Sequence, residues 1–183
     1  VCALTLTYTM IIGIGGRSRS GKTTLAETLV WHERSQNKRA IALHQDDFVK
    51  RLYEIPLIHD HTDWETPESI DFELLKKVVS NLRNDFDVIV IEGILAFADS
   101  GLNALYDYCF FTIISEETFW VRKSADTRWG EEPAWYVGHI WDSFLKYGQP
   151  PAELPNLMEI DGEQPYQMDK IVAFLRHFDK HSI

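Results

Sequence analysis

A short glycine-containing segment constrains this chain more than any other feature. Residues Gly16–Thr23 read Gly-Arg-Ser-Arg-Ser-Gly-Lys-Thr and fit the pattern G-x-x-x-x-G-K-[ST]. The apolar run Met10–Ile14 precedes this segment, and a helical pattern, Lys22–Glu33, begins inside it. Between a strand and a helix, the pattern predicts a tight loop whose backbone N–H groups surround the phosphates of a nucleoside triphosphate. The alternative is an ordinary Gly/Ser loop, which the flanking strand and helix disfavour.

The residue types inside this loop predict separate roles. We expect the Lys22 ammonium to reach the β- and γ-phosphates and the Thr23 hydroxyl to ligate Mg²⁺. The predicted ATP-binding residues are Gly16, Ser18, Arg19, Ser20, Gly21, Lys22, Thr23 and Thr24.

Strand-like and helix-like patterns alternate along the chain. Short apolar runs predict strands at Met10–Ile14, Ala40–His44, Val88–Ile91, Tyr108–Ile114 and Leu157–Ile160. Helical spacing predicts helices at Lys22–Glu33, Pro67–Leu82, Glu116–Thr127, Ala134–Lys146 and Tyr166–Phe178. Continuous apolar runs are typical of strands buried on both faces, so we predict an α/β fold with an open parallel sheet covered by helices on both sides. Ligands of such sheets bind beyond the carboxyl ends of the strands.

The composition narrows the class of protein. With 183 residues and 45% apolar side chains, we expect a single domain, in which residues 1–9 form a leader. A formal charge of −10 argues against nonspecific nucleic-acid binding. We expect no membrane segment and no signal peptide, which predicts a cytoplasmic protein. Cys2 and Cys109 predict neither a disulfide nor a zinc site, and the sequence leaves monomer and homodimer open.

A carboxylate closes one of the predicted strands. Glu92 follows the run Asp87–Ile91, which directs it into the expected phosphate crevice. An acid at this place can hold Mg²⁺ together with Thr23. The alternative, a solvated glutamate at a strand end, is disfavoured by the phosphate loop upstream.

Two further acids follow the predicted strand Ala40–His44. Phosphoryl transfer to an alcohol needs a base for the hydroxyl proton, and either Asp46 or Asp47 can supply it. The alternative is that both aspartates cap the next segment. We interpret His44 as structural, since it ends a buried strand.

Five segments together resemble one known family. They are Gly13–Leu25, His44–Lys50, Asp63–Ser69, Val90–Phe97 and Tyr136–Tyr147. They are similar to nicotinamide riboside kinases, which group with uridine kinases among the small P-loop nucleoside kinases. The resemblance implies a five-stranded parallel sheet of order 2-3-1-4-5 and a small lid at about 122–134. It also implies that ATP and Mg²⁺ serve phosphorylation of a ribose 5′-hydroxyl, converting nicotinamide riboside to nicotinamide mononucleotide.

The resemblance also implies roles for individual residues. It implies that Asp46 is the general base and that Asp47 has a structural role. It also implies that Thr23 and Glu92 ligate Mg²⁺. Lys22 and Arg128 complete the implied catalytic set. The implied substrate-binding residues are Asp46, Phe48, Asp63, Trp64, Glu65, Arg128 and Trp129.

The acceptor residues depart from the family pattern. The chain has Trp64-Glu65 where the family has an aromatic residue followed by the aspartate that binds the ribose 2′- and 3′-hydroxyls. Glu65 keeps two acceptor oxygens but adds a methylene, and Asp63 is the fallback ligand. We predict that Trp64 and Trp129 face the cationic pyridinium of nicotinamide riboside, for which core packing is the alternative.

The lid also departs from the family. Ser124 stands where the family has an arginine, and only Arg128 matches cleanly. We hypothesise that Arg19 replaces the missing charge at the phosphates, against the alternative that it is merely exposed. Other functions remain open at this stage: a uridine or cytidine kinase, a kinase of another small alcohol, or an ATP-binding sensor or pseudokinase.

Overall fold

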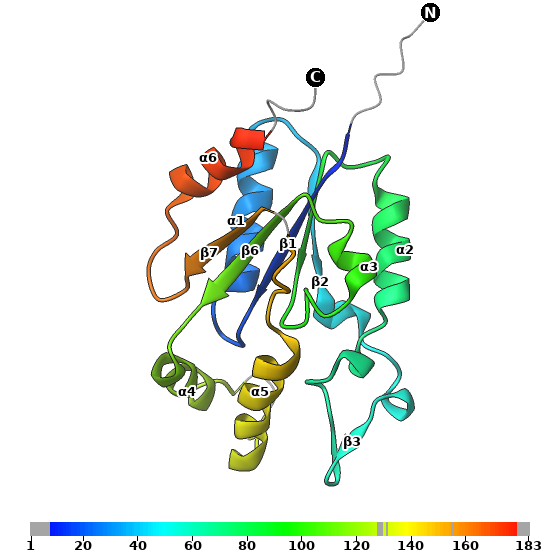
Figure 1. Ribbon diagram of the computed structural model, residues 1–183, viewed down its shortest axis with the longest axis vertical. Helices are drawn as coiled ribbons and strands as arrows, with labels where there is room; N and C mark the ends of the chain where they lie inside the picture. Colours follow the sequence, from blue (N-terminus) through cyan, green and yellow to red (C-terminus); the bar gives the residue numbers. More distant parts are fainter. Residues whose placement is uncertain (1–7, 128–129, 131, 155, 179–183) are drawn as a thin grey trace, which may run out of the picture.

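A computed structural model describes residues 8–127, 130, 132–154 and 156–178. Within this part of the chain, a five-stranded parallel sheet has the order β2-β5-β1-β6-β7 (Figure 1). Its strands are β1 (Met10–Gly16), β2 (Ala40–His44), β5 (Val88–Glu92), β6 (Tyr108–Ile113) and β7 (Leu157–Asp161).

This sheet confirms the predicted fold class. Numbered along the chain, its five strands lie in the order 2-3-1-4-5. Each of these strands coincides with a predicted apolar run, within two residues at either end. The central β1 and β5 are buried along their whole length, as continuous apolarity predicts for strands covered on both faces.

Helices cover both faces of the sheet (Figure 1). On one face, α1 (Lys22–Ser35) and α6 (Met168–Phe178) enclose a core that includes Ile12, Leu25 and Phe110. On the other, α2 (Phe72–Leu82) and α3 (Ser100–Asn103) enclose a second core with Ile11, Leu75 and Ile89. The sheet is therefore held rigidly between two apolar layers.

Three predicted helices are shorter in the structure, and one of them, predicted as Tyr166–Phe178, begins two residues later as α6. The segment predicted as Pro67–Leu82 divides into a 3-10 turn, Pro67–Ser69, and α2, because the Asp71 side chain accepts a hydrogen bond from Leu74 N and caps a new helix start. The helix predicted to reach Thr127 is α4 (Glu116–Ser124).

Several small elements gather at the carboxyl ends of the strands, at the lower end of Figure 1. They are the 3-10 turns η1 (Gln45–Phe48) and η2 (Leu52–Glu54), the hairpin strands β3 (Leu57–Ile58) and β4 (His61–Thr62), and helices α4 and α5 (Ala134–Tyr147). The turns η1 and η2 and the hairpin were not predicted. They surround the sheet edge at which we expected the ligand.

The structure also bears on two further expectations, which concern the cysteines and a membrane segment. Cys109 is buried in β6, and this burial raises the pKa of its thiol to about 12, which disfavours the reactive thiolate. Cys2 lies outside the described residues. None of the helices in the described ranges is both long and apolar enough to cross a membrane.

Candidate active site

The strand register brings the predicted motifs to one level of the sheet. The Cα of Ile14 pairs with that of Glu92 across β1 and β5, and Glu92 pairs with His44 across β5 and β2. The phosphate loop follows β1 and η1 follows β2. The loop, Glu92 and the Asp46 turn therefore leave the sheet side by side.

The glycines of the phosphate loop stand where no other residue fits. Gly16 has φ +144° and Gly21 has φ +96°, the conformations that favour glycine. A Cβ at Gly16 would lie 2.1 Å from Thr112 Oγ1, and one at Gly21 would lie 2.1 Å from the Tyr166 hydroxyl. That hydroxyl donates to Gly21 O at 2.6 Å, so α1 begins against a fixed neighbour.

The two functional side chains of the loop have defined partners. Lys22 is buried, and its Nζ donates to Arg17 O at 2.7 Å. Thr23 Oγ1 donates to Glu92 Oε1 at 3.0 Å. The predicted metal ligands Thr23 and Glu92 are thus in direct contact.

This contact fits the predicted Mg²⁺. Bonds of about 2.0–2.1 Å at right angles place neighbouring ligand oxygens about 2.9 Å apart, close to the 3.0 Å between Thr23 Oγ1 and Glu92 Oε1. Among the described residues, no group of three His, Cys, Asp or Glu side chains forms a metal cage. A metal held by these two oxygens would draw its other ligands from phosphate and water, which is the usual environment of Mg²⁺ in phosphate-handling sites.

His44 lies in the site, although its sequence position suggested a structural role. Its Nδ1 is 2.8 Å from Glu92 Oε1, the same oxygen that Thr23 contacts. His44 therefore orients the carboxylate predicted to hold the metal. The sequence signal that could have indicated this role is the position of His44 two residues before Asp46, the predicted base.

Asp46 is the exposed member of the group of side chains that also includes Lys22 and Glu92. Although its side chain is exposed, the surrounding protein withdraws it from part of the solvent, and this desolvation together with the Glu92 carboxylate raises its pKa. The Lys22 ammonium acts in the opposite direction. Asp46 thus shares one electrostatic environment with both the predicted phosphate-binding lysine and the predicted metal ligand.

Glu65 follows β4 and lies close enough to Asp46 and Lys123 for both charges to act on it. Burial raises its pKa to about 7, and the carboxylates of Asp63, Glu132 and Asp46 add to the shift. Lys123 opposes the shift. The buried Lys123 ammonium itself lies 2.7 Å from Glu132 Oε2, so a charged pair from the predicted lid region faces Glu65.

Helix α5 contacts residues 63–65, which we call the acceptor loop because Asp63, Trp64 and Glu65 are predicted to bind the phosphate acceptor. His139 Nε2 lies 2.8 Å from Asp63 Oδ1, which also accepts a hydrogen bond from Glu65 N at 3.1 Å. Trp64 N donates to the Tyr136 hydroxyl at 3.3 Å, and the Trp64 side chain is 37% exposed. Trp64 is therefore accessible to solvent, and its contact with a ligand stays a prediction. His139 belongs to a segment that carries the family resemblance, but no role was predicted for it, because its partner Asp63 lies far away along the chain.

The other predicted site residues take different positions. Phe48 is buried in the core beneath α2, so its substrate role stays a prediction. Ser20 is buried against the Thr112 hydroxyl, Ser18 is half-buried, and Thr24 is exposed.

Arg19 extends toward the end of α4. Its side chain is 37% exposed, and Nε lies 3.8 Å from Asp126 Oδ2. The hypothesis that it serves the phosphates stays a prediction. Arg128 and Trp129 lie outside the described residues.

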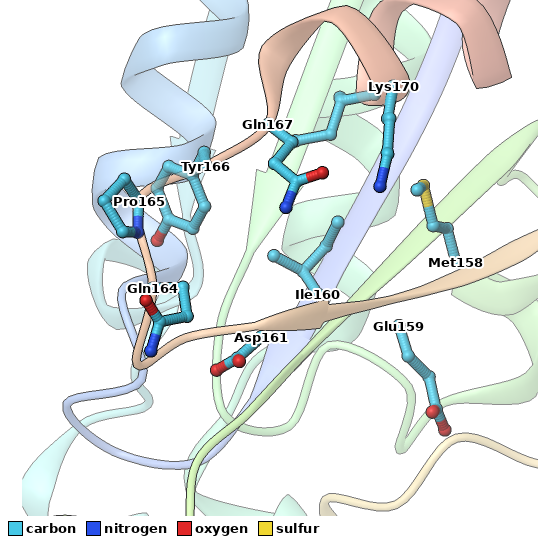
Figure 2. A pocket seen from close by; sticks show the side chains of 10 residues that line it. Met158, Glu159, Ile160, Asp161, Gln164, Pro165, Tyr166, Gln167 and Lys170 are labelled. Atoms are coloured by element: carbon cyan, nitrogen blue, oxygen red, sulfur yellow. The ribbon is translucent and has the colours of Figure 1, made fainter.

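A separate cavity of about 210 Å³ lies between β7 and the start of α6. Figure 2 shows Lys170 and Gln167 above Ile160, and Tyr166 beside α1. Tyr166 links this cavity to the phosphate loop, but none of the predicted site residues lines it.

Comparisons with known proteins show which proteins this chain resembles. No family model matches the chain. Human nicotinamide riboside kinase 2 is 28% identical over 160 residues, covering 76% of this chain and 68% of that protein. Human nicotinamide riboside kinase 1 is 28% identical over 158 residues, covering 77% of each. The predicted resemblance to nicotinamide riboside kinases is confirmed.

A solved structure supports the fold. A possible uridine kinase from Bacillus stearothermophilus superimposes with a TM-score of 0.55 at 20% identity, covering 85% of this chain and 91% of that one. The fold that the resemblance implied is thus similar to that of a solved structure.

Proposed function

We propose that this protein is an ATP-dependent kinase that phosphorylates the ribose 5′-hydroxyl of a nucleoside, with nicotinamide riboside as its preferred acceptor. One observation carries the proposal. The loop lysine Lys22, the Thr23–Glu92 pair and the exposed Asp46 lie at the same edge of the sheet. This arrangement unites a phosphate cradle, a metal-binding pair and a proton acceptor, the parts that phosphoryl transfer requires.

In the proposed reaction, the acceptor hydroxyl oxygen forms a bond to the γ-phosphorus while the bond to the β–γ bridging oxygen breaks and ADP leaves. The hydroxyl proton passes to the Asp46 carboxylate. Lys22 stabilises charge on the transferring group. Thr23 and Glu92 would hold Mg²⁺, which would supply positive charge to offset that of the phosphates. The raised pKa of Asp46 makes its carboxylate a better proton acceptor.

The charge around the acceptor loop supports a cationic substrate. Asp46, Asp63, Glu65 and Glu132 all act on this region, whereas Lys123 is the cation acting on Glu65. Nicotinamide riboside carries a positive pyridinium ring, and uridine is neutral. The exposed Trp64 offers the pyridinium an aromatic face, a contact of about 0.5–2 kcal/mol.

A substrate panel tests the proposal. The protein is incubated with Mg²⁺, ATP and either nicotinamide riboside, uridine, cytidine or a simple alcohol, and the phosphorylated product is identified by mass spectrometry. We expect the highest kcat/KM for nicotinamide riboside. Preference for uridine or cytidine would make the protein a pyrimidine nucleoside kinase instead. Binding of ATP without turnover of any acceptor would indicate a sensor or pseudokinase.

The variant Asp46→Asn tests the proposed base. We expect kcat to fall by about 10²–10⁴-fold, the usual contribution of a general base, while the affinity for ATP is kept. Asp47→Asn is the matched control, because Asp47 is an exposed neighbour in the same turn with an implied structural role. Equal losses in the two variants would exclude a special role for Asp46.

A further inference from the structure

Arg17, the second residue of the phosphate loop, packs against α5. Its guanidinium carbon lies 4.3 Å from the centroid of the Trp141 ring and 5.5 Å from that of Phe144. One terminal nitrogen donates to Ile114 O, directly after β6. The side chain therefore ties the loop to two other parts of the fold.

The backbone of the same residue holds the loop lysine. Arg17 O accepts hydrogen bonds from Lys22 Nζ at 2.7 Å and from Ser20 N at 3.2 Å. The peptide that fixes the position of Lys22 is thus attached, through its own side chain, to α5.

This arrangement is not explained by packing alone. Arg17 Nε is buried and has no hydrogen-bond partner, and burial lowers the pKa of the guanidinium, with Glu116 acting in the opposite direction. An unpartnered buried donor costs stability, which an apolar side chain of similar length would not. The guanidinium is specifically suited to contact an aromatic face and a carbonyl at the same time.

The helix that receives Arg17 also contacts the acceptor loop. Residues His139 and Tyr136 of α5 contact Asp63 and Trp64, and Trp141 lies further along the same helix. Helix α5 therefore contacts both the acceptor loop and the phosphate loop.

We propose that Arg17 is a positioning residue that anchors the phosphate loop on α5 and thereby holds Lys22 ready for the nucleotide. The proposal rests on the nucleotide-binding function proposed above. Without this contact, the loop is less ordered before binding. Ordering the loop then opposes nucleotide binding, and the affinity for the nucleotide falls.

The test measures binding of a non-hydrolysable ATP analogue with Mg²⁺ by calorimetry, with no acceptor present. For Arg17→Met we expect about tenfold weaker binding, the effect of fixing about one residue. Arg17→Lys keeps the cation and a donor, and we expect it to restore part of the affinity. Arg34→Met is the matched control, because Arg34 also donates to a backbone carbonyl, Ala40 O, but lies near the end of α1 away from the loop. We expect the control to bind as the wild type does.

A double-mutant cycle with Trp141→Leu separates anchoring from general destabilisation. If Arg17 acts through Trp141, Trp141→Leu alone weakens binding, and the double variant binds no more weakly than Arg17→Met. Additive losses, or an unchanged affinity in Arg17→Met, would overturn the proposal. Should Arg17→Met fail to fold, the same cycle with Arg17→Lys decides the question. Failure of the wild type to bind the analogue would instead refute the proposed function.

Discussion

At the scale of single residues, Glu65, a predicted substrate ligand, carries a charge that the fold disfavours. Its pKa of about 7 lies above its ordinary value of 4.5, chiefly because burial penalises the charged carboxylate. The folded protein thus holds a proton at Glu65 more tightly than the unfolded chain does. Between about pH 4.5 and pH 7 the unfolded state gives up this proton first, so the Glu65 contribution to stability falls as pH rises through this window.

The variant Glu65→Gln is expected to be more stable than the wild type at pH 8, because a neutral amide avoids the cost of burying a charge. Thermal unfolding of both proteins at pH 5 and pH 8 measures the difference. The advantage of the variant should be larger at pH 8, whereas Glu27→Gln, an exposed control on α1, should show no such trend. A difference between Glu65→Gln and the wild type that does not change with pH would contradict this account.

The same variant should lose affinity for nicotinamide riboside.

At the scale of elements, α5 joins parts of the site that are distant in the sequence. Its His139 contacts Asp63, and Asp63 in turn accepts a hydrogen bond from Glu65 N. Its Trp141 lies beside Arg17 of the phosphate loop. The helix therefore supports the acceptor loop and the phosphate loop through different side chains, and variants of the two contacts should have separable effects.

His139→Ala is expected to raise the KM for the acceptor about tenfold, because a hydrogen bond to a charged group contributes about 1.5–3 kcal/mol. The affinity for the ATP analogue should stay unchanged, in contrast to Arg17→Met. His139→Gln keeps a donor and should restore part of the effect. Steady-state kinetics together with calorimetry give both quantities. A loss of nucleotide affinity as large as the rise in KM would show that α5 acts as a general support instead.

The elements also show how far sequence reasoning reaches. The five sheet strands were predictable because each is a continuous apolar run, and the phosphate loop because its glycines and lysine have fixed spacing. The hairpin Leu57–Ile58 with His61–Thr62 was missed, since strands of two residues show no periodicity. The contact between Arg17 and Trp141 depends on how the helix α5 packs, which no local pattern encodes. The role of His44 depends on the strand register.

At the scale of the whole molecule, the excess of acid affects how substrates arrive. The chain has 28 acidic and 18 basic side chains, a formal charge of −10. A field of this sign attracts cations and repels anions over a distance set by the ionic strength. ATP must therefore be bound by local groups such as Lys22 and the loop N–H groups, whereas a cationic acceptor is attracted by the molecule as a whole.

Ionic strength should therefore change the kcat/KM of the proposed acceptor in a charge-dependent way. Raising the salt concentration from about 0.01 M to 0.15 M shortens the screening length from about 30 Å to 8 Å, so we expect the kcat/KM of nicotinamide riboside to fall several-fold. Its dihydro form has nearly the same shape but no charge on the ring, and its kcat/KM should fall less. Initial rates at low acceptor and saturating ATP concentrations measure both. Because ATP binding is common to both acceptors, its own salt dependence cancels in their ratio. A ratio that does not change with salt would mean that the acidic surface does not contribute to substrate choice, leaving recognition of the pyridinium to short-range contacts such as Trp64.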